Sequence, residues 1–113
     1  MSSKELSSAM KQLAEEKAEI YRIFSNAKRV LIFWLLNEEE MPVYKIAESI
    51  DSSIQNTSQH LRLMKANRIL ETRRNGKEVF YRIADSEVGE FCKTIHKVDL
   101  RDLKKEGINL PPP

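Results

Sequence analysis

The sequence predicts a mainly α-helical fold with a β-hairpin wing, the winged helix-turn-helix, in the element order α-α-α-α-β-β-α. From Ser53 onward, apolar residues recur every three or four positions, at Ile54, Thr57, Leu61 and Met64, which is typical of one helical face. Residues 69–74 and 77–83 then flank Asn75-Gly76, a dipeptide typical of hairpin turns. A shorter amphipathic segment at 43–50 precedes both, so these elements together complete a helix-turn-helix followed by a wing.

The bulk composition is that of one small, helix-rich domain. The chain has 113 residues, of which 41% are hydrophobic and 32% charged, and we expect one domain over residues 1–106 with a proline-rich tail at 107–113. Its longest apolar run, residues 30–36, is too short to span a membrane, and residues 1–12 lack a signal-peptide core. A single cysteine cannot form an internal disulfide, which predicts a cytoplasmic location.

Residues 3–20 are predicted to form a helix with a narrow apolar stripe. The stripe consists of Leu6, Met10, Leu13 and Ile20 and is continued by Tyr21 and Phe24. A narrow stripe suits packing on a partner helix in another subunit, although a peripheral helix on its own domain would show the same pattern. Ser25-Asn26 then caps residues 27–37, which are apolar on most sides. This second helix is predicted to be the buried centre, with Phe33 and Trp34 in the core.

The remaining helices have clear ends. Residues 38–40 are three glutamates and predict a solvated loop, and Pro42 suits the first turn of a short helix that ends before Asp51. The last helix is expected from Ser86 to about residue 106, where Gly107 is a good stop. One face of this helix carries Val88, Phe91, Ile95 and Val98. A chain this short has too little core to cover both apolar stripes, so a homodimer is predicted.

The hairpin is predicted to place basic residues at its tip. With Asn75-Gly76 as the two turn residues, Arg73 would face Glu78 and Thr72 would face Val79. The buried face would then consist of Leu70, Thr72, Val79, Tyr81 and Ile83. The tip would carry Arg73, Arg74 and Lys77.

Positive charge is concentrated on the same third of the chain. Residues 53–83 hold seven Lys or Arg and two Asp or Glu, a net charge of +5, whereas residues 1–52 carry −2 and residues 84–113 carry −1. Such a concentration is expected of a phosphate-binding surface. The outer face of the helix after Ser53 carries amide and guanidinium groups, which pair with base edges in a major groove, at Gln55, Asn56, Gln59 and Arg62. The predicted partner is therefore double-stranded DNA.

Four segments, in this order, resemble the ArsR/SmtB family of winged-helix repressors. Residues 25–36 are similar to the family's ADPTRLRILxLL segment, residues 43–50 to its VxELAxxL helix, residues 57–61 to VSxHL and residues 73–81 to RREGR…YY. The resemblance covers about residues 20–98. It implies a homodimer joined through the first and last helices, and operator binding that blocks transcription until a chemical signal, an unidentified small-molecule or redox inducer, relieves it.

The predicted DNA-binding residues combine the helix, its cap and the wing. They are Ser53, Gln55, Asn56, Ser58, Gln59, His60, Arg62, Arg73, Arg74 and Lys77. By analogy with the family, Ser58 and His60 would contact phosphate or cap the structure. Ile54 would either touch a thymine methyl group or pack inward, and Arg73 would be free or held by Glu78.

The chain departs from the family at its metal sites. The thiolate motif CVCDL corresponds to residues 42–46, PVYKI, so both sulfur ligands are missing. Cys92, His96 and Asp99 would share a helical face, but they do not form the family's other metal motif. Cys92 is interpreted first as a small buried hydrophobic residue, with a redox thiol or a Zn²⁺ site shared with His96 across a dimer as alternatives. We predict no cofactor and no metal.

The sequence also bears on whether the protein is an enzyme. A nucleophile elbow, a phosphate loop and a dinucleotide fingerprint are all missing from the sequence, so no enzymatic activity is predicted. A winged helix that binds only proteins remains the alternative, although a basic wing argues against it.

The family's glycine after the recognition helix is replaced by Asn67-Arg68, and Asn67 is expected to take the left-handed conformation there.

Overall fold

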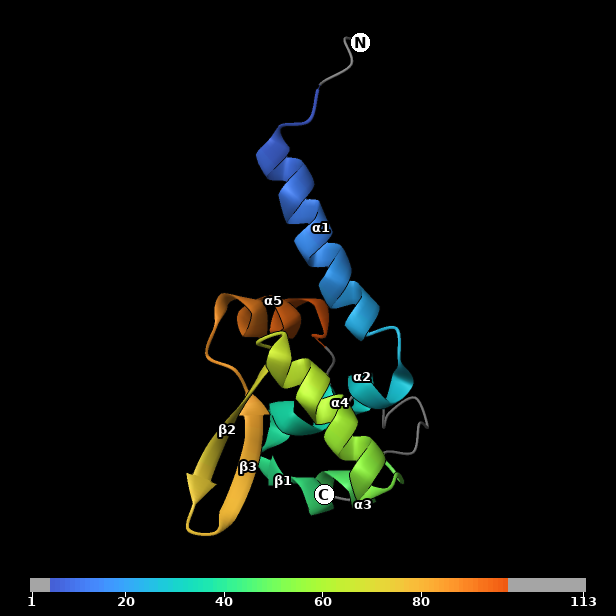
Figure 1. Cartoon of the computed structure of the whole chain (residues 1–113), viewed down its shortest axis with the longest axis vertical. Coiled ribbons are helices and arrows are strands. Elements are labelled where there is room, and N and C mark those ends of the chain that lie inside the picture. Colours follow the sequence, from blue (N-terminus) through green and yellow to red (C-terminus); the bar gives the residue numbers. More distant parts are fainter. Residues whose placement is uncertain (1–4, 98–113) are drawn as a thin grey trace.

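The computed structural model describes residues 5–97 and places five helices and three antiparallel strands among them (Figure 1). The elements are α1 (Ser8–Ile23), α2 (Ala27–Glu38), β1 (Met41–Pro42), α3 (Val43–Ser49), α4 (Ile54–Ala66), β2 (Leu70–Asn75), β3 (Glu78–Ile83) and α5 (Glu87–Ile95). This order confirms the winged helix-turn-helix. Sequence reasoning missed β1, whose two residues pair with β3 and make the sheet order β1-β3-β2. Within residues 5–97, no helix is long and apolar enough to cross a membrane.

The first helix is divided into an exposed half and a packed end. It begins at Ser8, later than predicted, because the Ser7 hydroxyl accepts a hydrogen bond from the Met10 amide at 3.1 Å. The exposed fractions of Leu6, Met10 and Leu13 are 54%, 56% and 51%, and this half extends beyond the other elements (Figure 1). Only the C-terminal end contributes buried residues, at Ile20 and Ile23. Most of the predicted stripe is therefore uncovered in the single chain.

The second helix forms the centre of the core, as predicted. Its cap is Asn26, whose side-chain oxygen accepts hydrogen bonds from the amides of Lys28 and Arg29 at 3.0 and 3.3 Å. Phe33 is buried, and Trp34 is half-buried against the core. Buried residues of every other helix and of both long strands join those of α2 in one apolar cluster, including Ile23, Ile46, Leu61, Met64, Leu70, Ile83 and Cys92. One apolar cluster thus holds the wing, the helix-turn-helix and α5 together.

The helix-turn-helix consists of α3, the turn at residues 50–53 and α4. Pro42 caps α3 rather than lying in its first turn, because its peptide group pairs in β1. Asp51 in the turn has φ of +53°, a conformation that short polar side chains tolerate. Thr57, Leu61 and Met64 are fully buried on the inner face of α4, whereas Ile54 is 54% exposed. The open question about Ile54 is therefore answered, since it does not pack inward.

The wing has the predicted faces but a different register. Asn75 lies opposite Glu78 and Thr72 opposite Tyr81, so the turn residues are Gly76-Lys77 and the predicted pairings of Arg73 with Glu78 and Thr72 with Val79 are wrong. Gly76 has φ of +65°, and a positive φ at the first turn residue alone fits a type II′ turn. The register differs from the prediction by two residues, and such a shift keeps each side chain on its face. Consequently the predicted buried face survives, with Leu70 and Ile83 in the core.

The helix α4 ends in a strained residue. Arg68, not Asn67, has the left-handed backbone, with φ of +61°, while Asn67 has φ of −95°. The Asn67 amide instead donates a hydrogen bond to the Leu63 carbonyl at 2.9 Å. The prediction that Asn67 takes the left-handed conformation is thus wrong by one residue.

Arg68→Gly should stabilise the protein. A left-handed conformation costs a residue with Cβ about 1–2 kcal/mol, and glycine forfeits roughly 0.5–1 kcal/mol of chain entropy, so we expect the free energy of unfolding to rise by about 0.5–1 kcal/mol. Urea unfolding at fixed protein concentration measures it. The control is Arg62→Gly inside α4, which should lower the free energy of unfolding by about 1 kcal/mol. A destabilised Arg68→Gly variant would contradict the strain argument.

The last helix is shorter than predicted. The Ser86 hydroxyl accepts a hydrogen bond from the Gly89 amide at 3.0 Å, and α5 ends at Ile95 with His96 as its cap. The prediction that this helix continues without a break to about residue 106 is therefore wrong. Val98, Asp99, Gly107 and the terminal prolines lie outside the described residues. Phe91 joins α5 to α1, because its ring centroid lies 6.1 Å from that of Tyr21 and 3.7 Å from the Lys17 ammonium.

Candidate nucleic-acid interface

The outer face of α4 presents polar side chains that have no partners in the described part of the chain. The Ser53 hydroxyl accepts a hydrogen bond from the Asn56 amide at 3.0 Å and fixes the start of the helix. Four exposed side chains follow, and within residues 5–97 none of them forms a hydrogen bond or an ion pair with another side chain: Gln55, Asn56, Gln59 and Arg62. Their donors and acceptors are available to a ligand. Amide and guanidinium groups can pair with the edges of bases.

Ser58 and His60 lie at the edge of this face and are half-buried. Burial lowers the pKa of His60 below its usual value, and the nearby charges of Arg29 and Lys28 lower it further. The imidazole is therefore neutral at pH 7 and can donate one hydrogen bond and accept another. Sequence reasoning missed Lys28 and Arg29, because they begin a helix that its apolar pattern assigned to the core.

The basic residues of the wing divide into paired and unpaired groups. The Arg73 Nε atom donates to Glu40 Oε1 at 3.0 Å, and the guanidinium carbon lies 5.0 Å from the Phe80 ring centroid. The prediction that Glu78 holds Arg73 is wrong, because Arg73 and Phe80 lie opposite each other in the sheet. By contrast, the exposed Arg74 and Lys77 have no ion pair among the described residues.

Acidic residues of the loop before β1 hold their neighbours in place. Glu39 forms an ion pair with Lys45 of α3 at 3.4 Å, and Glu40 forms the one with Arg73. The Tyr44 hydroxyl donates to Glu78 at 3.3 Å, which ties α3 to the wing. Glu39 and Glu40 therefore do more than the solvated loop that the sequence predicted, and Glu38 was wrongly placed in that loop, since it is the last residue of α2.

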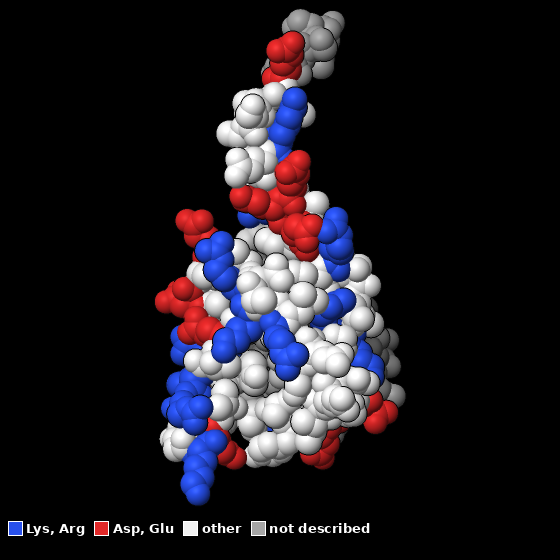
Figure 2. Space-filling view, in the orientation of Figure 1, with Lys and Arg blue, Asp and Glu red and all other residues white. Residues whose placement is uncertain are grey.

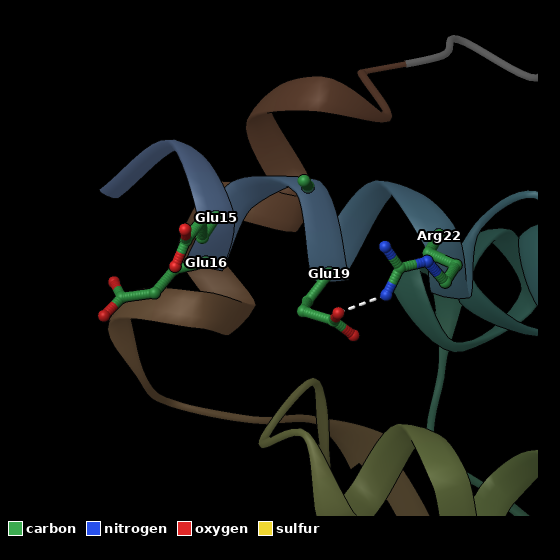
Figure 3. A pocket seen from close by; sticks show the side chains of 5 residues that line it. Glu15, Glu16, Glu19 and Arg22 are labelled. Atoms are coloured by element: carbon green, nitrogen blue, oxygen red, sulfur yellow. Dashed lines mark hydrogen bonds and ion pairs between the residues drawn. The ribbon is translucent and has the colours of Figure 1, made fainter. Parts of the chain in front are cut away.

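Basic side chains gather on one part of the molecule. Figure 2 shows Lys and Arg side chains along the wing and over the face that α4 occupies in Figure 1, whereas α1 carries acidic and basic side chains side by side. A shallow hollow of about 370 Å³ on α1 is lined by Glu15, Glu16, Ala18, Glu19 and Arg22, and there Glu19 pairs with Arg22 (Figure 3). Such a lining repels phosphate. The basic surface of α4 and the wing is thus the part that suits nucleic acid.

Cys92 and His96 pack as core residues. Cys92 is fully buried, and burial raises the pKa of its thiol to about 11, which leaves it protonated and weakly nucleophilic at neutral pH. The His96 ring packs against those of Phe24 and Phe33, with centroid distances of 4.1 and 5.3 Å, and burial lowers its pKa. Residues 5–97 contain no cluster of three potential metal ligands. The packing supports the interpretation of Cys92 as a small buried hydrophobic residue.

The fold and the basic outer face define a winged helix-turn-helix regulator, and comparisons with known proteins identify its family. No family model matches the chain. The transcriptional regulator KmtR of Mycobacterium tuberculosis is 36% identical over 70 residues, which cover 62% of this chain and only 54% of KmtR. A homologue of the cadmium resistance regulator CadC in Staphylococcus aureus is 35% identical over 90 residues, or 75% of this chain and 74% of that protein.

Solved structures agree with these relatives. The repressor BigR of Xylella fastidiosa has a TM-score of 0.74 at 26% identity, with 83% of this chain and 93% of that chain covered. The domain Mb0332 of Mycobacterium bovis, described as a homodimeric winged helix-turn-helix DNA-binding domain and a possible ArsR-family regulator, has a TM-score of 0.68 at 25% identity, with 89% and 92% covered. The chain belongs to the ArsR family of transcriptional regulators. All four of these proteins are described as regulators, repressors or DNA-binding domains rather than as enzymes.

Proposed function

We propose that this protein is a homodimeric repressor that binds duplex DNA sequence-specifically, with α4 in the major groove. The observation that carries the proposal is the outer face of α4, where Gln55, Asn56 and Gln59 are exposed beside a basic wing and their side chains have no partners within residues 5–97. A helix fits the width of a major groove, and each base pair presents a distinct pattern of donors and acceptors there. A protein-binding surface at this place would instead expose apolar or aromatic groups.

The proposed contacts fall into two groups. Gln55, Asn56, Gln59 and Arg62 would meet base edges, with the exposed Ile54 beside them for a thymine methyl group. Phosphate contacts would come from the cap, the edge of α4 and the wing tip, through Ser53, Ser58, His60, Arg74 and Lys77. Arg73 was expected among them, but its ion pair with Glu40 neutralises it in the free protein. We therefore assign Arg73 a weaker role than Arg74 and Lys77.

The dimer would use the uncovered stripe of α1. Met10 and Leu13 of α1, and Leu6 two residues before the helix begins, are each more than half exposed, and the structural relative Mb0332 is described as homodimeric. Two copies of one helix-turn-helix bind two half-sites about one helical turn apart on the DNA. A symmetric operator of this kind is the expected target.

The release signal would differ from that of thiolate-based metal sensors. Residues 42–46 lack the paired cysteines, and Cys92 is the only cysteine in the sequence and is buried. Soft metal ions need several sulfur ligands, so we infer a small-molecule or redox inducer rather than a metal bound by thiolates of one chain. The protein would act in the cytoplasm, where the DNA lies and a lone thiol stays reduced.

Selection from a randomised duplex library tests the proposed function directly. The purified full-length protein should enrich one sequence made of two inverted half-sites, with centres about 10–10.5 base pairs or a multiple of that apart. Footprinting of the enriched DNA should protect both half-sites. Enrichment of no sequence, with capture of a protein partner through α4, would instead favour the protein-interaction alternative.

Glu40→Gln should strengthen binding to DNA of any sequence. Removing the carboxylate frees Arg73 for a phosphate contact, which should steepen the dependence of log K on log salt by about 0.9 per subunit. Fluorescence anisotropy with a mixed-sequence duplex measures both quantities. Glu39→Gln is a matched control, because it removes the same charge from the same loop but releases Lys45 of α3 instead. Equal effects of the two substitutions would show that only net charge matters.

A further inference from the structure

The first turn of α2 carries two cations where a helix ordinarily favours acidic residues. Lys28 and Arg29 lie just after the cap Asn26, and this turn has no acidic residue. By comparison, α5 begins with Glu87 and carries Glu90 in its first turn. The amino end of a helix has a partial positive charge, so Lys and Arg are unfavourable there and anions are favourable. The electrostatics of the helix itself therefore do not explain why Lys28 and Arg29 lie in its first turn.

Both side chains lie beside the helix-turn-helix. The Lys28 Nζ atom donates to the Asp51 carbonyl oxygen at 3.4 Å, in the turn that leads into α4. The charges of Lys28 and Arg29 also lower the pKa of His60, which lies in the second turn of α4. The start of α2 and the edge of α4 thus form one surface, although their residues are more than twenty positions apart.

No acidic side chain of the described residues neutralises either cation. Both are half-buried, and among residues 5–97 neither forms an ion pair. The Arg29 Nε atom is buried without a hydrogen-bond partner in that part of the chain. A buried donor without a partner is costly, and a charged one more so. Since Asn26 already accepts the amides of residues 28 and 29, an anion arriving here would bind to the side chains.

We propose that Lys28 and Arg29 form a phosphate-binding site for duplex DNA, next to the groove that α4 enters, with His60 at its edge. This inference rests on the proposed DNA-binding function and extends the interface to a third element beside α4 and the wing. A backbone phosphate would supply the missing counter-ion to the Lys28 ammonium and the Arg29 guanidinium. The contact carries no sequence information, so it should act on every duplex alike.

Lys28→Gln tests the site through the salt dependence of binding to a mixed-sequence duplex. We expect weaker binding and a slope of log K against log salt that is flatter by about 0.9 per subunit, while Lys28→Arg retains both values. Lys93→Gln is the control, because it removes the same charge from α5, where Lys93 pairs with Glu90. Thermal unfolding of each variant confirms that the fold is retained.

The outcomes separate this inference from the proposed function. If Lys77→Ala flattens the salt slope but Lys28→Gln leaves it at the wild-type value, the protein binds DNA without this site and the inference is overturned. If the wild-type protein binds no duplex at all, both the proposed function and the inference fail. A slope flattened equally by Lys93→Gln would also overturn it, because only net charge would then matter.

A direct readout comes from the Arg29 Nε–H signal in nitrogen-edited NMR spectra of the full chain. Addition of the duplex should shift this signal, because the guanidinium gains an anionic acceptor. Inorganic phosphate at the same phosphate concentration should leave it in place. A signal that stays unchanged in DNA-saturated protein, or that responds only to inorganic phosphate, would show that the site does not take a DNA phosphate.

Discussion

Leu13→Glu should convert the protein from a dimer into a monomer and weaken its binding to operator DNA by orders of magnitude. Leu13 is 51% exposed in the middle of the uncovered stripe of α1. In a two-fold interface each substitution counts twice. Because only about half of each Leu13 side chain is left for the partner to cover, losing both removes about 1.5–3 kcal/mol of apolar stabilisation, before the cost of burying two carboxylates is added. Sedimentation velocity at micromolar concentration measures the change.

The neighbouring Gln12→Glu is the matched control for this prediction. It places the same charge one residue away, on an exposed part of α1 outside the stripe. We expect it to remain dimeric and to bind DNA as the wild type does, apart from a small effect of net charge. A wild-type protein that sediments only as a monomer at tens of micromolar, or a dimeric Leu13→Glu variant, would contradict an interface through α1.

The fold could be predicted because its elements have strong local signals. Apolar residues spaced three and four positions apart define the inner face of α4. Ser53 and Asn26 cap their helices, as the sequence indicated. The strand β1 was missed because two residues are too few to show a period. The wing register was predicted from the turn dipeptide Asn75-Gly76, but the observed turn residues are Gly76-Lys77. Because a shift of two residues keeps Leu70 and Ile83 on the buried face, the hydrophobic pattern could not distinguish the two registers.

The sequence predicted which basic and polar residues form the surface, but it could not predict the ion pairs that they make. Local sequence cannot show that Arg73 meets Glu40, since the two are 33 positions apart and come together only when the wing packs beside β1. The cations of α2 were missed for a related reason, because the apolar residues that follow them led to the prediction that the whole segment is buried in the core. A Lys-Arg pair directly after a helix cap was the available signal, since the helix dipole disfavours cations there.

Gln59→Ala should lower the specificity of DNA binding, whereas Lys77→Ala should weaken binding to every sequence and leave the specificity unchanged. Gln59 lies on the outer face of α4, where an amide can form two hydrogen bonds with one base. Losing such a contact should cost about 1–3 kcal/mol per half-site on the operator and little on random DNA. Lys77 lies in the turn of the wing, exposed and without an ion pair among the described residues. Its loss should weaken binding to all sequences and flatten the salt slope by about 0.9 per subunit.

The register of the wing sharpens this comparison, because Lys77 is itself one of the two turn residues and Arg74 lies one position before the closing pair Asn75–Glu78. Measuring log K against log salt for each variant, on the selected operator and on a random duplex, separates the two roles. Lys77→Arg should retain the wild-type slope, since it keeps the charge at the turn. If Gln59→Ala is silent on both DNAs while Lys77→Ala abolishes only operator binding, the wing reads sequence and α4 does not, so the docking of α4 in the major groove is wrong.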